Sequence, residues 1–215
     1  MSTLYSYFRS SAAYRVRIAL NLKGLDYDTV PVHLVRDGGE HLKPAYRALN
    51  VNALVPTFVD GGANLHQSLA IIEYLEEVHP TPALLPADPI ARAQVRALAL
   101  DIAADIHPID NLRVLRYLKH DLGVSEEQKN GWYKHWITEG FTSLEARLEA
   151  QAAPGKFTLG DTPTIADCCL VPQVYNANRF KVDMTAFPRI AAIDAHCQTL
   201  EAFRRAAPEA QPDAE

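Results

Sequence analysis

A proline-rich break near residue 80 constrains the fold more than any other feature of the chain. Four prolines fall within residues 79–89. Proline lacks a backbone donor and disfavours helix at the residue before it, so neither a helix nor a strand is expected to run through this segment. The hydrophobic pattern also changes there, from short strand-like runs to long helical ones. The sequence therefore predicts two domains, residues 1–82 and residues 83–215.

The first domain alternates strand and helix patterns, in the order β-α-β followed by β-β-α. Short apolar runs predict strands, and apolar residues that share one face predict helices. These elements fall at residues 4–7, 14–22, 27–32, 55–59, 63–66 and 69–78. Gly24 is expected to end the first helix, Asp60-Gly61-Gly62 to form a hairpin turn, and Ser68 to be a helix N-cap. The order predicts a small mixed sheet with helices on its faces.

The second domain contains helical patterns alone. They are rich in alanine and leucine and cover residues 90–118, 126–150, 164–177 and 187–206. Thr164 and Asp167 have the spacing of a capping box at the start of the third pattern. Cys168 and Cys169 follow it and are expected in the core rather than in a reactive site. The predicted fold class is α/β plus all-α.

The composition is that of an ordinary globular protein. The 215 residues carry a formal charge of −5 and 48% of them are hydrophobic, so only residues 208–215 are expected to be disordered. A mildly acidic chain argues against nucleic acid as the main partner, because phosphate binding needs a concentrated basic face. One basic row, Arg113, Arg116 and Lys119, is typical of a solvated helix face.

Membrane, secreted and metal-binding proteins are also disfavoured. No apolar run approaches the ~20 residues that span a bilayer. Arg9, Arg15 and Arg17 interrupt any signal peptide. Three cysteines without a C-x-x-C pair indicate a reduced, cytoplasmic protein. The eight histidines lack a tight ligand spacing, so we expect no metal.

Three short motifs in the first domain are candidates for ligand binding. Ser10-Ser11 stands between a strand and a helix, where a hydroxyl can donate to a thiolate or simply cap the helix. Gln67-Ser68 begins a helix whose dipole favours an anion such as a carboxylate; the alternative is a plain cap. Val55-Pro56 is either an edge-strand proline or a cis bond that turns the valine backbone toward an extended ligand.

Five motifs occur in a specific order along essentially the whole chain. They are Phe8-Arg9-Ser10-Ser11, Tyr14 to Leu20, Val55-Pro56-Thr57, His66 to Glu77 and Asn178 to Asp183. In this combination the chain resembles the zeta class of glutathione transferases. The resemblance implies a thioredoxin-like N-terminal domain, an all-helical C-terminal domain, a homodimer and glutathione as cofactor. It also implies cis–trans isomerisation of a dicarboxylate, either maleylacetoacetate or maleylpyruvate. The reaction would belong to the catabolism of aromatic compounds, either of aromatic amino acids or by the gentisate pathway.

The resemblance also implies roles for individual residues. Ser10 would face the glutathione sulfur with Ser11 beside it, and Val55 would pair through its backbone with the cysteinyl part, before a cis bond to Pro56. Gln67 and Ser68 would hold the γ-glutamyl carboxylate of glutathione. The resemblance implies three further glutathione contacts: His41, His107 and Asn111.

Three arginines are candidates for contact with the substrate. We hypothesise that Arg9 and Arg179 act in catalysis with Ser10, holding carboxylates and stabilising the enolate, and that Arg113 also binds the substrate. The alternative for each arginine is a surface salt bridge. The chain departs from the family at Ala12, where a cysteine is usual, so a protein thiol is not needed. Arg113 replaces a serine of some relatives and favours the shorter diacid.

Two other functions remain open on the sequence alone. One is a general glutathione transferase or dehalogenase of α-halo acids, which needs the same thiolate and arginines. The other is a glutathione-binding module without catalysis, because fold does not fix function. The joint presence of Ser10, Gln67, Ser68, Arg9 and Arg179 argues against a pure scaffold.

Overall fold

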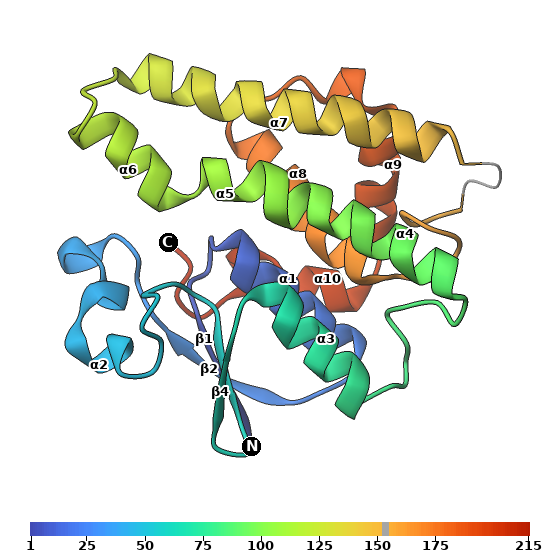
Figure 1. The fold of residues 1–215 in the computed structure, drawn as a ribbon, viewed down its shortest axis with the longest axis horizontal. Helices are drawn as coiled ribbons and strands as arrows, with labels where there is room; N and C mark the ends of the chain where they lie inside the picture. The colour runs from blue at the N-terminus through green and yellow to red at the C-terminus, as the bar shows by residue number, and fades with distance from the viewer. Residues whose placement is uncertain (152–154) are drawn as a thin grey trace. The chain divides into compact units, whose positions relative to one another are not determined.

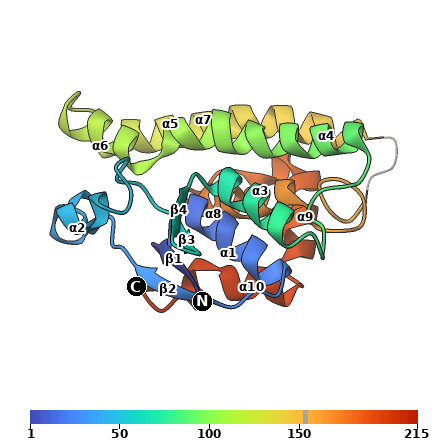
Figure 2. The same cartoon turned by 60° about the horizontal axis from the view of Figure 1, so that its bottom comes forward.

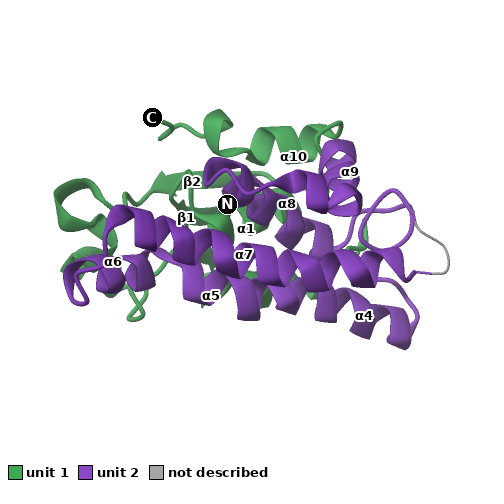
Figure 3. Ribbon diagram, turned by 90° about the horizontal axis from the view of Figure 1, so that it is seen from above, with its two compact units in different colours: residues 1–85, 198–215 green, residues 86–197 purple. Residues whose placement is uncertain are grey.

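The computed structural model describes residues 1–151 and 155–215, and the chain forms two compact units. Unit 1 contains Met1–Leu85 and Gln198–Glu215, and unit 2 contains Pro86–Cys197 (Figure 3). The predicted boundary at residues 82/83 lies three residues before the division after Leu85. The structure differs from the prediction for residues 198–215, which belong to unit 1 rather than to the helical domain.

Unit 1 (Figure 1) is built on a four-stranded sheet in the order β2-β1-β3-β4, whose four strands are labelled in Figure 2. The strands are β1 (Ser2–Ser6), β2 (Tyr27–Pro31), β3 (Thr57–Asp60) and β4 (Ala63–His66). β1 pairs in parallel with β2 and antiparallel with β3, and β3 and β4 form the predicted hairpin. Pro56 precedes β3 and therefore removes no donor from the ladder. The connectivity confirms the thioredoxin-like arrangement.

The helices of unit 1 come from both ends of the chain. They are α1 (Ser11–Leu22), α2 (Pro44–Arg47), α3 (Ser68–Val78) and α10 (Glu201–Ala206), with 3₁₀ turns at Arg36–Gly38, Glu40–Leu42 and Pro208–Ala210. α1 packs against both α3 and α10 (Figure 2). Asn21 Nδ2 donates to the carbonyl oxygen of Ala202 at 2.9 Å. These contacts explain why residues 198–215 belong to unit 1.

The ends of α1 follow local sequence rules. The side chain of Ser10 caps the helix, which therefore begins three residues earlier than predicted. At the other end Gly24 has a φ of +65°, and Leu25 N–H donates to the carbonyl oxygen of Leu20 at 3.0 Å. Gly24 therefore ends the helix as expected, because glycine has no Cβ and adopts this left-handed conformation without steric cost.

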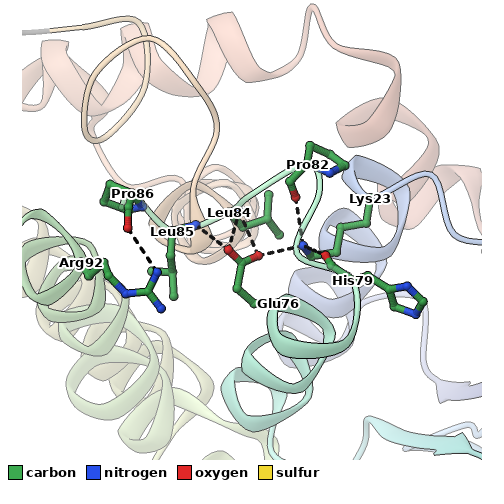
Figure 4. Close-up of polar contacts among 8 residues, drawn as sticks. All are labelled: Lys23, Glu76, His79, Pro82, Leu84, Leu85, Pro86 and Arg92. Carbon is green, nitrogen blue, oxygen red and sulfur yellow. Dashed lines mark hydrogen bonds and ion pairs between the residues drawn. The ribbon is translucent and has the colours of Figure 1, made fainter. Parts of the chain in front are cut away.

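A buried ion pair fixes the proline-rich segment that follows α3. Lys23 Nζ donates to Glu76 Oε2 at 2.7 Å and to the carbonyl oxygens of His79 and Pro82 (Figure 4). Glu76 in turn accepts from the backbone N–H groups of residues 84 and 85. Buried charges are tolerated when paired and hydrogen-bonded in this way. The segment predicted as a break is thus an ordered connection.

Unit 2 is helical, as predicted. Its helices are α4 (Pro89–Leu100), α5 (His107–Asp110), α6 (Leu112–His120), α7 (Glu126–Glu149), α8 (Ile165–Arg179) and α9 (Pro188–Cys197), with a π-helical turn at Asp101–Ile106 and a 3₁₀ turn at Met184–Ala186. No helix in the described part of the chain is long and apolar enough to cross a membrane. Thr164 and Asp167 form the predicted capping box of α8, and Cys168 and Cys169 are fully buried.

Two of the predicted helices are interrupted. The pattern at residues 90–118 contains the π-helical turn and then a break at Asn111, whose ψ of 162° ends α5 and whose side chain caps α6. The pattern at 187–206 divides into α9 and α10, which lie in different units. Both stretches have a helical pattern without strand signals, so the sequence pattern alone does not show the breaks.

Candidate functional site

The loop between β1 and α1 carries the first candidate residues. Ser10 is the N-cap of α1, and its Oγ accepts a hydrogen bond from Ala13 N–H at 3.2 Å. The half-exposed hydroxyl thereby lies at the positive end of the helix dipole. Its own hydrogen is not used by the cap, because the oxygen is the acceptor there. Ser10 can therefore donate to an anion such as a thiolate. Ser11, the first residue of the helix, is buried.

Arg9 is held by aromatic side chains of the same loop. Its Nη2 donates to the Tyr7 hydroxyl at 2.9 Å, and the guanidinium lies 4.9 Å from the centre of the Phe8 ring. Among the described residues no carboxylate pairs with it, although the residue is exposed. The surface salt bridge considered as an alternative is therefore absent from this part of the chain, and the charge remains available to an anionic ligand.

The start of α3 departs from the prediction. Ser68 was expected as the N-cap, but it is the first helical residue, and Gln67 occupies the cap position with no side-chain capping bond. Gln67 also has a φ of +71°, a conformation that costs a non-glycine residue on the order of 1 kcal/mol and is concentrated at functional sites. The amides at the N-terminus of this 11-residue helix are thus not satisfied by a cap, which suits a carboxylate.

Arg15 connects α1 to the start of α3, and it was not among the candidate residues predicted from the sequence. The prediction placed Arg15 and Arg17 off the apolar face of α1, yet their exposed fractions are only 2% and 0%. Arg15 Nη1 donates to Ser68 Oγ at 3.3 Å. A buried guanidinium stays charged when it is hydrogen-bonded, and it adds positive potential at the start of α3. The signal in the sequence was a pair of arginines within an otherwise apolar helix.

His41 and Val55 are placed by tight backbone turns. His41 is buried in the 3₁₀ turn Glu40–Leu42. Gly39, with a φ of +111°, has no room for a Cβ, which would lie 2.4 Å from His41 Cε1. The Val55-Pro56 peptide bond is cis, as the resemblance implied. The glutathione contacts of His41 and Val55 remain predictions.

The remaining candidates belong to unit 2. His107 is half-buried on α5. Asn111 Oδ1 accepts from the backbone N–H groups of Arg113 and Val114, at 3.1 and 3.3 Å, so this oxygen serves as the cap of α6. Its amide hydrogens can still be donated to a ligand. The Arg113 side chain is exposed in the first turn of α6.

Arg179, the last residue of α8, lies among aromatic rings. Its guanidinium is 4.7 Å from the centre of the Phe180 ring, and Phe180 stacks on Tyr133 with 3.6 Å between ring centres. Arg179 also hydrogen-bonds the Tyr133 side chain, while burial raises the pKa of that phenol to about 12. The exposed arginine is therefore held by neutral aromatic groups, which leaves its charge for a ligand.

Asp110 is a buried carboxyl group that the sequence analysis did not select. It is 4% exposed, and neither of its carboxyl oxygens has a hydrogen-bond partner among the described residues. Burial raises its pKa to about 8. The group is consequently a neutral acid near pH 7, beside the candidate residues His107 and Asn111 in the chain. Nothing in its sequence context distinguishes it from a solvated aspartate.

Comparison with known proteins agrees with this geometry. Residues 4–83 match the model of the glutathione S-transferase N-terminal domain, and residues 130–195 match that of the C-terminal domain. A solved maleylpyruvate isomerase, described as a bacterial glutathione S-transferase of the zeta class, is 54% identical, with a TM-score of 0.96 over 99% of this chain and 100% of its own. The chain belongs to the zeta class of glutathione transferases.

Two further relatives of this transferase are informative. A probable maleylacetoacetate isomerase of Vibrio cholerae is 55% identical over 98% of this chain and 97% of its own. The structure of a maleylacetoacetate isomerase from Methylobacterium extorquens AM1 holds malonate and glutathione. It is 39% identical, with a TM-score of 0.95 over 99% of each chain.

Proposed function

We propose that this zeta-class transferase is a glutathione-dependent isomerase that converts a maleyl diketo acid to its fumaryl isomer. The observation that carries the proposal is the full-length similarity, at 54–55% identity, to proteins named for the isomerisation of maleylacetoacetate and of maleylpyruvate. The local structure of both units is consistent with it, because each presents arginine charges without a carboxylate partner among the described residues. A dicarboxylate substrate requires such groups.

The residues of unit 1 fit glutathione. The α3 N-terminus, with its uncapped amides, Ser68 and the buried Arg15, would hold the γ-glutamyl carboxylate. Gln67, whose side chain makes no capping bond, would donate to the same group. Ser10 at the α1 N-terminus would face the sulfur, with Ser11 beside it. When bound, glutathione supplies a thiolate that adds to the double bond, permits rotation about it, and leaves again.

Ser10 and α1 act on the charge of that sulfur. A hydroxyl donor and a helix N-terminus both favour a thiolate over a thiol, which lowers the pKa of a sulfur placed there. Ala12 occupies the position of the usual family cysteine, so the chain itself provides no thiol in this loop. Ser10 is therefore the protein group that activates the nucleophile.

Arginines bind and stabilise the substrate in this proposal. Arg9 and Arg179 would each hold a carboxylate or the carbonyl oxygen on which negative charge develops, since a planar guanidinium donates two parallel bonds. Arg113 would add a third positive charge for a doubly anionic substrate. This third charge favours maleylpyruvate, the shorter of the two diacids, over maleylacetoacetate. The methylene that separates them is worth about 1–3 kcal/mol in a fitted pocket.

We also propose a cytoplasmic homodimer that acts in the catabolism of aromatic compounds, either aromatic amino acids or gentisate. The family membership and the reduced cysteines support this setting: all three cysteines are free and buried. Light scattering on the purified protein tests the assembly. A mass of about twice 23.8 kDa is expected, and a single-chain mass would contradict it.

An ultraviolet assay of both maleyl diketo acids, each with and without glutathione, tests the function. Turnover of either acid only when glutathione is present is the expected result. The ratio of the two kcat/KM values then identifies the substrate. Glutathione binding without turnover of either acid, together with halide release from an α-halo acid, would replace isomerisation by dehalogenation.

A further inference from the structure

Within unit 1, hydrogen bonds hold both the backbone N–H group and the backbone carbonyl oxygen of Phe8. Phe8 N–H donates to Asp213 Oδ2 at 3.0 Å, across 205 positions of the chain. The carbonyl oxygen of Phe8 accepts from Arg17 Nη2 at 2.9 Å. Phe8 directly precedes Arg9 and Ser10, so these two bonds fix the backbone from which both candidate catalytic side chains extend.

Arg17 connects the loop to the C-terminal segment of unit 1. Its side chain is fully buried, and it donates to Ser6 Oγ and to the carbonyl oxygen of Ala206, both at 2.9 Å. Burial lowers the pKa of Arg17 to about 10, and the negative charge of Asp213 is one of the interactions that raise this pKa. Arg17 therefore stays positively charged near neutral pH, and the negative charge of Asp213 helps to stabilise that charged form.

The segment that carries Asp213 is ordered, which contradicts the predicted disorder of residues 208–215. Pro208 is buried at the start of a 3₁₀ turn. Gln211 Nε2 donates to the carbonyl oxygens of Arg205 and Ala207, at 2.9 Å each, so its side chain caps the end of α10. The sequence looked disordered because its residues are polar and small, whereas specific backbone contacts fix it.

Glu215 fastens the same segment beyond Asp213. Its Oε1 lies 2.7 Å from Arg36 Nη2 and 3.3 Å from His33 Nε2. The His33 ring packs edge-on against Tyr7, with 4.9 Å between ring centres, and Tyr7 accepts the hydrogen bond of Arg9. The C-terminal segment thus contacts the loop directly at the Phe8 backbone, and it is linked indirectly to Tyr7 through His33.

We propose that Asp213 is a positioning residue that, together with Arg17, fixes the Phe8–Ser10 loop in its active conformation. A carboxylate bonded to a backbone N–H is a strong, charge-assisted interaction. Without it, the Phe8 N–H loses its partner while Arg17 still holds the carbonyl oxygen, so the peptide is held on one side alone and can tilt, which displaces Arg9 and the Ser10 hydroxyl. Displacements of about 1 Å cost up to 10²-fold in rate when catalytic groups must be aligned. The inference rests on the proposed function of Arg9 and Ser10.

Three variants of the full chain test the proposal. Asp213→Ala removes the acceptor, and Asp213→Asn keeps an acceptor oxygen but not the charge. Glu201→Ala is the matched control, because it removes an exposed carboxylate of α10 whose ion-pair partner among the described residues is Arg204, three residues on. For each variant we would measure kcat and KM for the maleyl acids, the Kd of glutathione, the thiolate absorbance of bound glutathione against pH, and thermal unfolding.

The proposal predicts that Asp213→Ala lowers kcat about tenfold or more at saturating glutathione. It also predicts a higher pKa of the bound thiol, because Ser10 is displaced, with partial rescue in Asp213→Asn and no change in Glu201→Ala. Wild-type kcat and thiol pKa in a folded Asp213→Ala protein would overturn it. If the wild-type protein isomerises neither acid, the proposed function fails, and the thiol titration alone then decides on Asp213.

Discussion

The guanidinium of Arg15 in α1 donates a hydrogen bond to the Ser68 hydroxyl, 3.3 Å away at the first residue of α3. Both side chains are buried, with exposed fractions of 2% for Arg15 and 5% for Ser68. A positive charge is thereby placed at a helix N-terminus that no side chain caps. The Arg15 charge and the N-terminus of α3 both favour the binding of an anion beside Ser68.

Replacement of Ser68 should weaken glutathione binding more than catalysis. Ser68→Ala removes one hydroxyl from the anion site and leaves Arg15 without this acceptor. A lost bond to a charged group is worth about 1.5–3 kcal/mol, so the Kd of glutathione should rise by about tenfold or more. Isothermal titration calorimetry measures it, with Ser68→Thr as the matched variant that keeps the hydroxyl. An unchanged Kd in Ser68→Ala would remove Ser68 from the site.

Replacement of either Arg9 or Arg179 should impair the reaction but not glutathione binding. Arg9→Ala and Arg179→Ala each remove a charge assigned to the substrate, and kcat/KM should fall by about tenfold or more because a carboxylate loses its partner. Steady-state kinetics measure it, beside glutathione titrations. Arg204→Ala, which removes an exposed arginine paired with Glu201, is the control. Wild-type turnover in both variants would exclude the carboxylate role.

Asp110 should make the protein less stable as the pH rises. Its pKa is about 8 in the folded chain, against the ordinary aspartate value of 3.8 expected in the unfolded chain. Between these values the folded state binds more protons, so the free energy of unfolding decreases from about pH 4 to about pH 8. Asp110→Asn keeps the shape without a titrating group, so its free energy of unfolding should not show this decrease with pH.

Urea unfolding across this pH range measures the Asp110 effect. Glu139→Gln on the exposed side of α7 is the control and should keep the wild-type slope. A pH dependence of stability that is identical in wild type and Asp110→Asn would show that Asp110 ionises without cost in the folded state.

Loss of the Glu76 carboxylate should destabilise unit 1 strongly. Glu76→Gln leaves the Lys23 ammonium buried with only the carbonyl oxygens of His79 and Pro82 and the amide oxygen. Breaking a buried pair in this way costs about 3–5 kcal/mol. The exposed Glu126, which pairs with Lys119 and Lys129, is the comparison, since Glu126→Gln should cost much less than Glu76→Gln because water screens exposed ion pairs. Equal losses in the two variants, measured by denaturant unfolding, would contradict the account.

Features encoded in short stretches were predictable from the sequence. The Gly24 stop, the Gly61-Gly62 turn and the Thr164–Asp167 capping box each depend on two to four neighbouring residues, and the structure has all three. The hairpin of β3 and β4 was also predictable, because its turn lies between two adjacent strand patterns, whereas the order β2-β1-β3-β4 was not predicted. The functional roles of the candidate motifs were inferred from their resemblance to a family, because the spacing of the residues alone does not indicate those roles.

Features that depend on distant partners were not predictable. Arg15 and Arg17 were expected outside the core, because a charged side chain within an apolar pattern normally faces water. Arg15 has a partner 53 residues away at Ser68, and one partner of Arg17 is 189 residues away at Ala206. The burial of Asp110 and the order of residues 208–215 likewise depend on tertiary packing. Local patterns contain no record of such contacts.

Isomerisation in the presence of S-methylglutathione tests the central claim most directly. This analogue keeps the carboxylates that the α3 N-terminus would bind but has no thiol to ionise at Ser10. The account predicts that glutathione supports many turnovers and is recovered unchanged, whereas S-methylglutathione binds and supports none. Turnover with the methylated analogue would show that the sulfur is not the nucleophile, and the assignment of Ser10 would then be wrong.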